Sequence, residues 1–138
     1  MKTLLYALIL TLTVCPAYGR EANGIESDTL IKTSTSWNGD SLPAYPQGEP
    51  EITILRITIP PKTALPWHRH PFINAGVLLS GQLTVVTESG KTLHMKPGEP
   101  LVEVVNTWHH GVNDGDVPAE ILVFYAGVKG MPVSVKRP

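Results

Sequence analysis

The sequence predicts an all-β fold, either a closed barrel or a sandwich, from three observations. From Glu51 onward the chain is a series of short runs rich in Val, Ile, Leu and Thr. Ser-Gly, Pro-Gly and Asn-Asp-Gly turns separate these runs, and the 138 residues include thirteen prolines and twelve glycines. No window of a dozen residues has a helical period. Short strands bounded by such turns are typical of barrels and sandwiches, and a chain of this length forms one domain.

Residues 1–19, MKTLLYALILTLTVCPAYG, are predicted to be a cleavable export signal. Lys2 precedes an apolar run that ends at Val14, and small residues follow it, as they do before a signal-peptidase cut, here before Arg20. The apolar run has about 11 residues, whereas a membrane span needs roughly 20. Cys15 would indicate a lipid anchor only if a smaller residue than Val14 preceded it. We therefore expect a periplasmic or secreted protein without membrane attachment once the leader is cleaved.

Cleavage of this leader defines the chemistry left to the mature chain. It removes one of the eleven basic residues and none of the twelve acidic ones, so the net charge becomes −2. It also removes the only cysteine, so neither a disulfide nor thiolate chemistry is expected. The remaining basic residues are scattered and form no basic stripe, which argues against binding to nucleic acid.

The mature chain is expected to have three parts. Residues 20–50 are polar and interrupted by Gly and Pro, so they are expected to form an extended arm with one edge strand near 29–33. The barrel is expected over 51–127, and the tail 128–138 is expected to add a short strand. The arm has too few apolar residues to fold alone, and short barrels leave edge strands unpaired. We therefore expect a homodimer in which the arm of one copy covers an edge of the other.

The stretch LPWHRHPFINAG, residues 65–76, contains the first candidate site. Side chains alternate across a strand, so His68, His70 and Asn74 point into the same cavity if the strand stays regular across Pro71. Two imidazoles spaced in this way can bind one metal ion. A carboxylate would be the natural third donor at the position of Asn74.

Two turns are expected to follow this strand. Residues 78–83 read as a tight hairpin, in which Gly81 supplies the positive φ that such turns require. Residues 82–97 have the length of a second hairpin. The first expectation rests on local turn chemistry and the second on length.

The segment HRHPFINAGVLLSG is similar to the first motif of the cupin family. That motif has the form His-x-His, three or four residues, Glu, six residues, Gly. His68, His70 and Gly81 match it, whereas Asn74 replaces the glutamate. Lys62 stands where the family has a glycine.

The segment GEPLVEVVNTWHHGVN resembles the second cupin motif. That motif has the form Gly, five residues, Pro-x-Gly, two residues, His, three residues, Asn. Gly98, His109 and Asn113 match it, whereas Val104 and Asn106 replace the proline and the second glycine. The two motifs occur in order and at the expected separation, and the similarity extends over residues 52–126.

The resemblance implies a double-stranded β-helix, a jelly-roll-like barrel with a divalent metal ion bound by His68, His70 and His109. Imidazole nitrogens suit Fe, Cu and Zn. Export in an unfolded state would load the metal outside the cytoplasm, where intrinsic affinity favours Cu and Zn, while analogy with family enzymes favours Fe. The alternative is a vestigial site, in which the three histidines only form hydrogen bonds inside a polar pocket.

Asn74 changes what such a site can do. A neutral amide is a poorer ligand than a carboxylate, so the ion would keep more positive charge and more open positions, and would be a stronger Lewis acid. Cupins similar to thiol dioxygenases and diketone-cleaving dioxygenases have three-histidine sites of this kind. Metal binding is therefore expected to be weakened but retained.

Glu103 is the nearby carboxylate that can compensate. It lies in an apolar run of leucine and valine residues, an unusual place for an acid without a partner. We expect it to act as a catalytic base or hydrogen-bond acceptor beside the metal rather than as a direct ligand. The alternative is a solvent-facing position on an edge strand.

Other residues are weaker candidates. Tyr125 can offer a hydroxyl to a bound ligand or pack in the core, and Asn113 can brace the second motif or contact substrate. His110 has the opposite parity to His109, and His94 is expected at the surface. Trp67 and Trp108 can line the cavity mouth or belong to the core.

Three classes of function remain open for a small-molecule ligand. The first is oxygen-dependent oxidation or cleavage of a small anion. The second is a metal-assisted lyase, isomerase or hydrolase in which Glu103 transfers a proton. The third is a non-catalytic protein that binds a small ligand or metal. A fold alone does not select among them.

Overall fold

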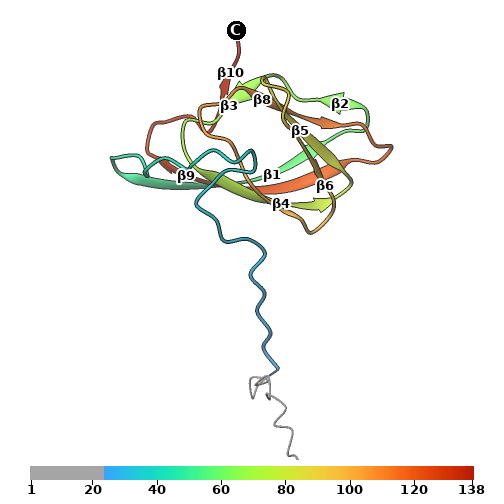
Figure 1. The fold of residues 1–138 in the computed structure, drawn as a ribbon, viewed down its shortest axis with the longest axis horizontal. Helices are drawn as coiled ribbons and strands as arrows, with labels where there is room; N and C mark the ends of the chain where they lie inside the picture. Colours follow the sequence, from blue (N-terminus) through green and yellow to red (C-terminus); the bar gives the residue numbers. More distant parts are fainter. Residues whose placement is uncertain (1–23) are drawn as a thin grey trace, which may run out of the picture.

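The computed structural model describes residues 24–138, which form two β-sheets that face each other (Figure 1). This part of the chain contains ten strands and no helix, which confirms the all-β fold. It follows that no helix in this range is long and apolar enough to span a membrane. The expected leader and its cut before Arg20 lie outside the described residues.

The first sheet has four strands in the order β1-β9-β4-β7. Their bounds are Pro50–Ile59 for β1, Ala119–Val128 for β9, Asn74–Ser80 for β4 and Pro100–Val102 for β7. All neighbours pair antiparallel, and the longest ladder joins β1 to β9 over ten residue pairs. This pairing ties the start of the barrel to its last long strand.

The second sheet has the order β10-β3-β8-β5-β6, and β2 also pairs with β8. Its strands are β2 (Thr63–Ala64), β3 (His68–Arg69), β5 (Leu83–Thr87), β6 (Thr92–Met95), β8 (His109–Asn113) and β10 (Val135–Lys136). The expected hairpin within residues 82–97 is the β5–β6 pair. The last strand of the tail pairs with β3, so the C-terminal segment contacts the barrel.

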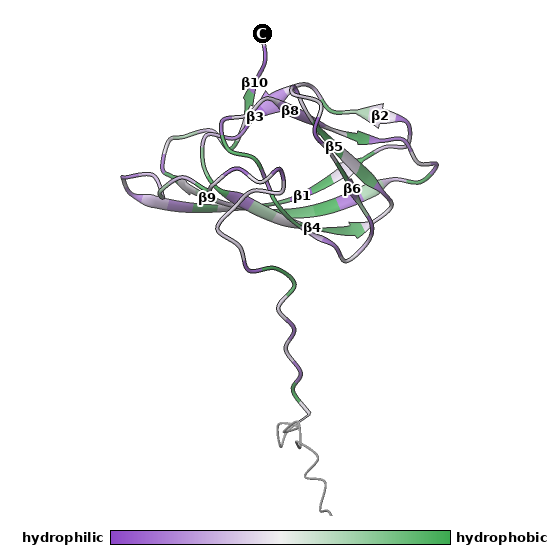
Figure 2. Cartoon of the chain, viewed as in Figure 1, coloured by the Kyte–Doolittle hydropathy of each residue, from purple (hydrophilic) through white to green (hydrophobic). Residues whose placement is uncertain are grey.

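The core lies between the two sheets and follows the alternation of the strands. Buried apolar residues come from both sheets: Ile59, Phe72, Leu78, Leu83, Val85, Met95, Leu101, Ala119, Ile121, Val123 and Tyr125. Hydrophobic residues are visible along β1 and β4 in Figure 2. The same buried face becomes polar toward one end, where the cross-strand pairs Asn74–Tyr125 and Thr87–His109 lie. This polar end contains the candidate site.

The expected hairpin at residues 78–83 is wrong. Gly81 does take a positive φ of 74°, but β4 and β5 belong to different sheets and do not pair. A Cβ at Gly81 would lie 2.5 Å from the carbonyl oxygen of Pro118. The tight turn therefore carries the chain from one sheet to the other, close against the segment before β9. Local turn chemistry cannot distinguish this crossing from a hairpin.

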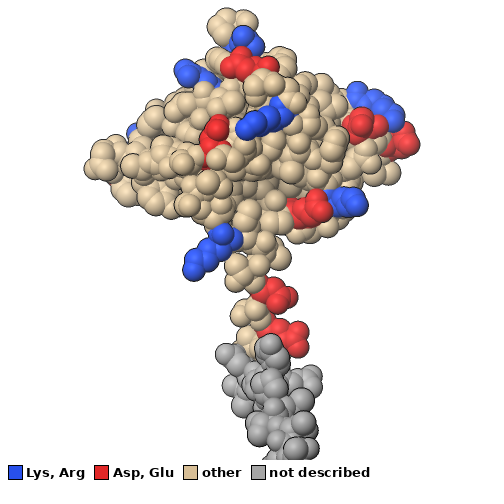
Figure 3. Space-filling view, in the orientation of Figure 1, with Lys and Arg blue, Asp and Glu red and all other residues tan. Residues whose placement is uncertain are grey.

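The N-terminal arm differs from expectation in one respect. No strand forms at residues 29–33; between residues 24 and 49 the only bridge is an isolated one between Thr35 and Ser41. Residues 36 and 37 instead contact the end of β7, where Trp37 N donates to the carbonyl of Val102 over 2.9 Å. On the face shown in Figure 3, side chains of both charge signs are interspersed.

Candidate metal centre

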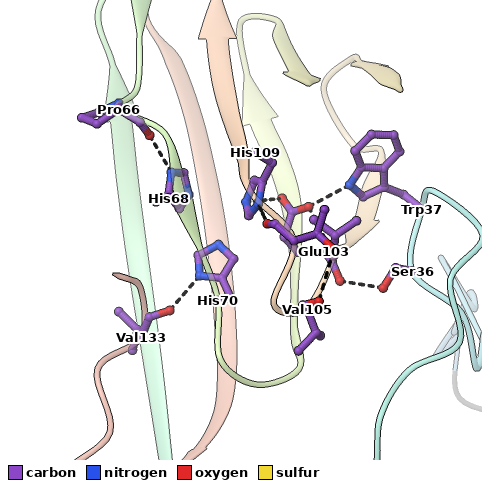
Figure 4. A network of polar contacts seen from close by, with 11 residues as sticks. Ser36, Trp37, Pro66, His68, His70, Glu103, Val105, His109 and Val133 are labelled. Carbon is purple, nitrogen blue, oxygen red and sulfur yellow. Dashed lines mark hydrogen bonds and ion pairs between the residues drawn. The ribbon is translucent and has the colours of Figure 1, made fainter. Parts of the chain in front are cut away.

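Three histidines from neighbouring strands meet at the polar end of the barrel (Figure 4). His68 begins β3 and His109 begins β8, and the two residues are cross-strand partners. His70 follows β3 and forms a parallel bridge with Val105. The ring centroids lie 4.5 Å apart for His68 and His109, and 5.0 Å apart for the other two pairs. The structure therefore brings together the three histidines that the sequence motifs indicate.

A backbone carbonyl orients each imidazole. The Nδ1–O distances are 2.8 Å for His68 with Pro66, 2.7 Å for His70 with Val133 and 2.8 Å for His109 with Thr107. A carbonyl oxygen only accepts hydrogen bonds, so each ring carries its proton on Nδ1 and keeps a lone pair on Nε2. Histidines that bind metals are oriented in the same way. One ring nitrogen from each residue lies within 4.8 Å of the others.

Burial keeps these rings neutral. It lowers the pKa of His68 and of His109 below the ordinary value, and it lowers the pKa of His70 to about 3. The cause is loss of hydration, because water stabilises the charged imidazolium more than the neutral ring. At neutral pH all three Nε2 atoms therefore have the lone pair that metal coordination requires.

Glu103 is buried beside the histidines, not exposed at an edge. Its side chain is 5% exposed, and its Oε1 accepts hydrogen bonds from Trp37 Nε1 at 2.7 Å and from Val104 N at 2.9 Å. Its Oε2 lies 3.6 Å from Nε2 of His109. Burial raises the pKa of this carboxyl, while the two hydrogen bonds act in the opposite direction.

Asn74 and Tyr125 line the cavity next to this cluster. Asn74 is 2% exposed, and its Nδ2 atom has no hydrogen-bond partner among the described residues. The ring of Tyr125 lies 5.4 Å from that of His70, and burial raises the pKa of its hydroxyl to about 12. Tyr125 therefore packs in the core and also lines the cavity, with its hydroxyl protonated at neutral pH.

The donor atoms fit a divalent transition-metal ion. Nε2 of His109 is buried without a hydrogen-bond partner in the described chain, and such an atom costs free energy unless something binds it. Neutral imidazole nitrogens with a carboxylate nearby suit Zn, Cu and Fe. The three histidines can therefore hold a metal ion.

Two adjoining cavities lead to this cluster. An inner cavity of about 50 Å³ contacts all three histidines, Asn74 and Glu103. An outer cavity of about 200 Å³ shares His68, His70 and Tyr125 with it and is lined by Lys136. The inner cavity has room for an ion and a few water molecules. The outer one can admit a small molecule.

Apart from Tyr125, the weaker candidates lie away from these cavities. His94 is exposed, and His110 stacks on Trp67 with ring centroids 4.2 Å apart. Trp108 lies beneath the guanidinium groups of two arginines. Asn113 is fully buried, and its amide donates to three backbone carbonyls, which braces the chain around the second motif.

Sequence reasoning missed residues in the N-terminal arm and in the C-terminal tail. Trp37 holds Glu103, and Ser36 Oγ donates to the carbonyl of Glu103 over 2.9 Å. At the other end, Val133 orients His70 and Lys136 lines the outer cavity. The only tryptophan of a largely polar arm was the signal for Trp37.

Comparisons with known proteins agree with this architecture. A family model described as the Cupin domain matches residues 55–125, more than half of the chain. No curated protein matches the sequence. Among solved structures, a protein with a double-stranded β-helix domain from Klebsiella pneumoniae subsp. pneumoniae is 17% identical, with a TM-score of 0.55. That similarity covers 69% of this chain and 90% of the other.

Two enzymes of known activity have similar folds. The oxalate decarboxylase of Lactobacillus farciminis, solved as a formate complex, is 21% identical with a TM-score of 0.54, over 62% of this chain and 26% of that one. The DMSP lyase DddQ of Ruegeria pomeroyi is 20% identical with a TM-score of 0.54, over 62% of this chain and 42% of that one. At these identities the similarity shows the fold alone.

Proposed function

Because this chain belongs to the cupin family, we propose that it is an exported, single-domain metalloprotein that oxidises or cleaves a small anionic molecule with oxygen. His68, His70 and His109 hold a divalent ion of Fe, Cu or Zn. The observation that carries the proposal is the carbonyl hydrogen bond on Nδ1 of each ring, which leaves three Nε2 lone pairs facing one cavity. Histidines that merely packed in a core would not need a common orientation of this kind.

The outer cavity supports an anionic substrate. Lys136 lines it together with His68 and His70, so one positive charge lies near the path to the proposed ion. The other lining residues are mostly apolar, such as Leu55 and Val133, and exclude water from a bound anion. The bound ion supplies Lewis acidity and, if it is Fe or Cu, redox chemistry.

A second candidate function is a metal-assisted lyase, isomerase or hydrolase. The specific observation in its favour is Tyr125, which lines both cavities and whose hydroxyl, with a pKa of about 12, stays protonated at neutral pH. It can donate a hydrogen bond or a proton to a bound anion without any oxidant. Activity of the Zn-loaded protein without oxygen would favour this candidate, whereas oxygen consumption with Fe or Cu would favour the first.

The proposal is tested by elemental analysis of residues 20–138 purified from an exported preparation. We expect a divalent transition metal bound in stoichiometric amount, and intact-mass analysis should show that residues 1–19 have been removed. Oxalate, used as a probe anion, should raise the Tm of the metal-loaded protein but not of the metal-free protein. Protein that stays metal-free after incubation with Fe(II), Cu(II), Zn(II) and Mn(II) in turn would exclude the proposed function.

A further inference from the structure

Asn74 and Glu103 are neighbours across the ladder between β4 and β7. The ladder pairs Ala75 with Val102 and Gly76 with Leu101. Glu103 N then donates to the carbonyl oxygen of Asn74 over 3.1 Å, which continues the pairing by one step. The two side chains share a face of the sheet, and both are buried, at 2% and 5% exposure. The residue that replaces the motif glutamate therefore lies directly opposite a buried glutamate.

The contact between Glu103 and His109 is unfavourable unless a cation lies near it, because two atoms with lone pairs face each other. Nδ1 of His109 donates to the carbonyl of Thr107, so Nε2 has a lone pair that faces Oε2 of Glu103 at 3.6 Å. That distance is too long for the two atoms to share a proton, because N–H···O bonds measure about 2.7–3.2 Å. Two donors on one tetrahedral ion, each about 2.1 Å from it, lie about 3.4 Å apart. The separation therefore fits two ligands of one metal ion.

The N-terminal arm presents Glu103 in the orientation that this requires. Trp37 Nε1 and Val104 N both donate to Oε1, so Oε2 is the oxygen directed at the histidines (Figure 4). Ser36 Oγ fixes the Glu103 carbonyl, and Trp37 N fixes the carbonyl of Val102. Proteins commonly orient a metal-binding carboxylate through hydrogen bonds to the oxygen that does not bind the metal.

We propose that Glu103 is the fourth protein ligand of the metal ion held by His68, His70 and His109, and that Trp37 is its positioning residue. The carboxylate that the first motif lacks at Asn74 is thus supplied from the adjacent strand. This inference rests on the proposed metal binding. In this arrangement Glu103 does not transfer a proton to the substrate, because it lines the inner cavity and not the outer one.

Asn74 takes a different role in this arrangement. Its amide contributes no charge, and its unpaired Nδ2 lines the inner cavity. The amide can donate a hydrogen bond to an oxygen of water or substrate beside the ion. With Glu103 as a ligand, the protein ligands of the ion keep the single negative charge that the family motif provides. Asn74 places a hydrogen-bond donor at the position where the motif has a ligand.

Co(II) titration with a competing chelator tests the inference, because both the Kd and the visible absorption of Co(II) report its ligands. Glu103→Gln keeps the size of the side chain and an oxygen for Trp37 but removes the charge. We expect its Kd to rise by more than the roughly 100-fold that loss of an outer-shell partner causes, with a changed absorption spectrum. Trp37→Phe should raise the Kd by about 10- to 100-fold. The matched control is Glu120→Gln, a partly exposed glutamate on β9 that pairs with Arg56.

A swapped variant completes the test. Asn74→Glu/Glu103→Gln moves the carboxylate back to the motif position, and its Kd should lie within about tenfold of wild type. If Glu103→Gln does not fold, Trp37→Phe decides the matter, since it leaves Glu103 in place and an unchanged Kd for Co(II) would contradict the inference. Unchanged Kd and absorption in Glu103→Gln would overturn it while leaving the proposed metal site intact. Wild-type protein that binds no Co(II) would overturn both.

Discussion

His70 is oriented by Val133, a residue 63 positions later in the chain: Nδ1 of the ring donates to the Val133 carbonyl over 2.7 Å. The tail that contains Val133 continues into β10, where Val135 pairs with Arg69 and Lys136 with His68. The last residues of the chain therefore hold both histidines of the first motif from outside the barrel.

Removal of this tail should weaken metal binding without unfolding the barrel. A chain that ends at Gly130 loses the carbonyl partner of His70 and the pairing of β3 with β10, while β3 keeps its pairing with β8. Because loss of such an orienting partner typically costs about 10- to 100-fold in metal affinity, we expect a rise of that size in the Kd for Zn(II). A chain that lacks only Pro138 is the control. Equal affinities for the two chains, measured by competition with a chelator, would show that the tail does not orient the site.

Replacement of any one of His68, His70 and His109 with Ala should remove most of the bound metal. Each substitution removes one of the proposed donors and leaves two imidazoles with the Glu103 carboxylate, a smaller donor set that holds the ion less tightly, while the remaining rings keep their carbonyl partners. His94→Ala and His110→Ala are matched controls, because both are histidines outside the cavities. Elemental analysis of the five variants makes the comparison. Loss of metal in either control, or retention in any of the three, would contradict the assignment.

Much of this site could be predicted because motif spacing acts locally. The regular strand expected through Pro71 does not form: His68 lies in β3 of the second sheet and Asn74 in β4 of the first, so the two residues line one cavity from different sheets. His68 and His70 lie two residues apart near one short strand, and His109 begins the strand beside it. The burial of Glu103 could not be derived in this way. Its partner Trp37 lies 66 residues away in an arm that has no periodic pattern. The contact depends on where the arm crosses the end of β7, which only the tertiary structure defines.

The turn at Gly81 illustrates the same limit. The glycine requirement was evident from the sequence, since a positive φ at a Ser-Gly pair is a local property. Which strands the turn connects depends on the pairing of β4 with β9, more than thirty residues later in the chain. Which sheet a strand joins depends on residues far away in the chain, so it cannot be predicted from the turn residues alone.

The expected homodimer remains a prediction, and the outer face of the first sheet is the surface that supports it. Ile52 and Ile54 on the edge strand β1 are 66% and 54% exposed, and Phe124 opposite Ile54 is 45% exposed. Exposed apolar groups clustered on an edge favour association. We expect a dimer by light scattering at tens of micromolar and a monomer for Ile54→Lys. Val117→Lys, at an exposed apolar residue away from this face, should stay dimeric. Wild-type protein that is only monomeric would contradict the prediction.

Gly81→Ala should destabilise the barrel more than Gly90→Ala. Both glycines have positive φ, at 74° and 84°, so each substitution costs about 1–2 kcal/mol from backbone strain alone. A Cβ at Gly81 would also lie 2.5 Å from the Pro118 carbonyl oxygen, whereas one at Gly90 meets nothing within 4 Å. Urea unfolding should therefore show an additional loss of about 1–3 kcal/mol at Gly81. Equal losses in the free energy of unfolding would mean that the turn at Gly81 can move away from Pro118 at little cost.

The metal-free protein should lose stability as the pH falls below neutral. Burial lowers the pKa of His68, His70 and His109 from the ordinary 6.5, in the case of His70 to about 3. Between these values the unfolded chain takes up protons that the native chain does not, so the free energy of unfolding is highest above pH 6.5 and decreases below it. For His70 alone the loss at pH 5 is about 2 kcal/mol, because one pKa unit corresponds to about 1.4 kcal/mol.

Glu103 acts in the opposite direction over part of this range. Its pKa is raised, so as the pH falls the native state takes up this proton at a higher pH than the unfolded state does. Between the ordinary carboxyl pKa and the raised value, this uptake offsets the loss of stability that one of the three histidines causes. Because three histidines outweigh one carboxyl, the free energy of unfolding should still decrease as the pH falls. Urea unfolding of chelator-treated protein between pH 7 and pH 5 measures it, and His70→Gln, which cannot titrate, should reduce the decrease by the contribution of one ring. A free energy of unfolding that stays constant or rises toward pH 5 would show that the three rings are not held neutral by burial.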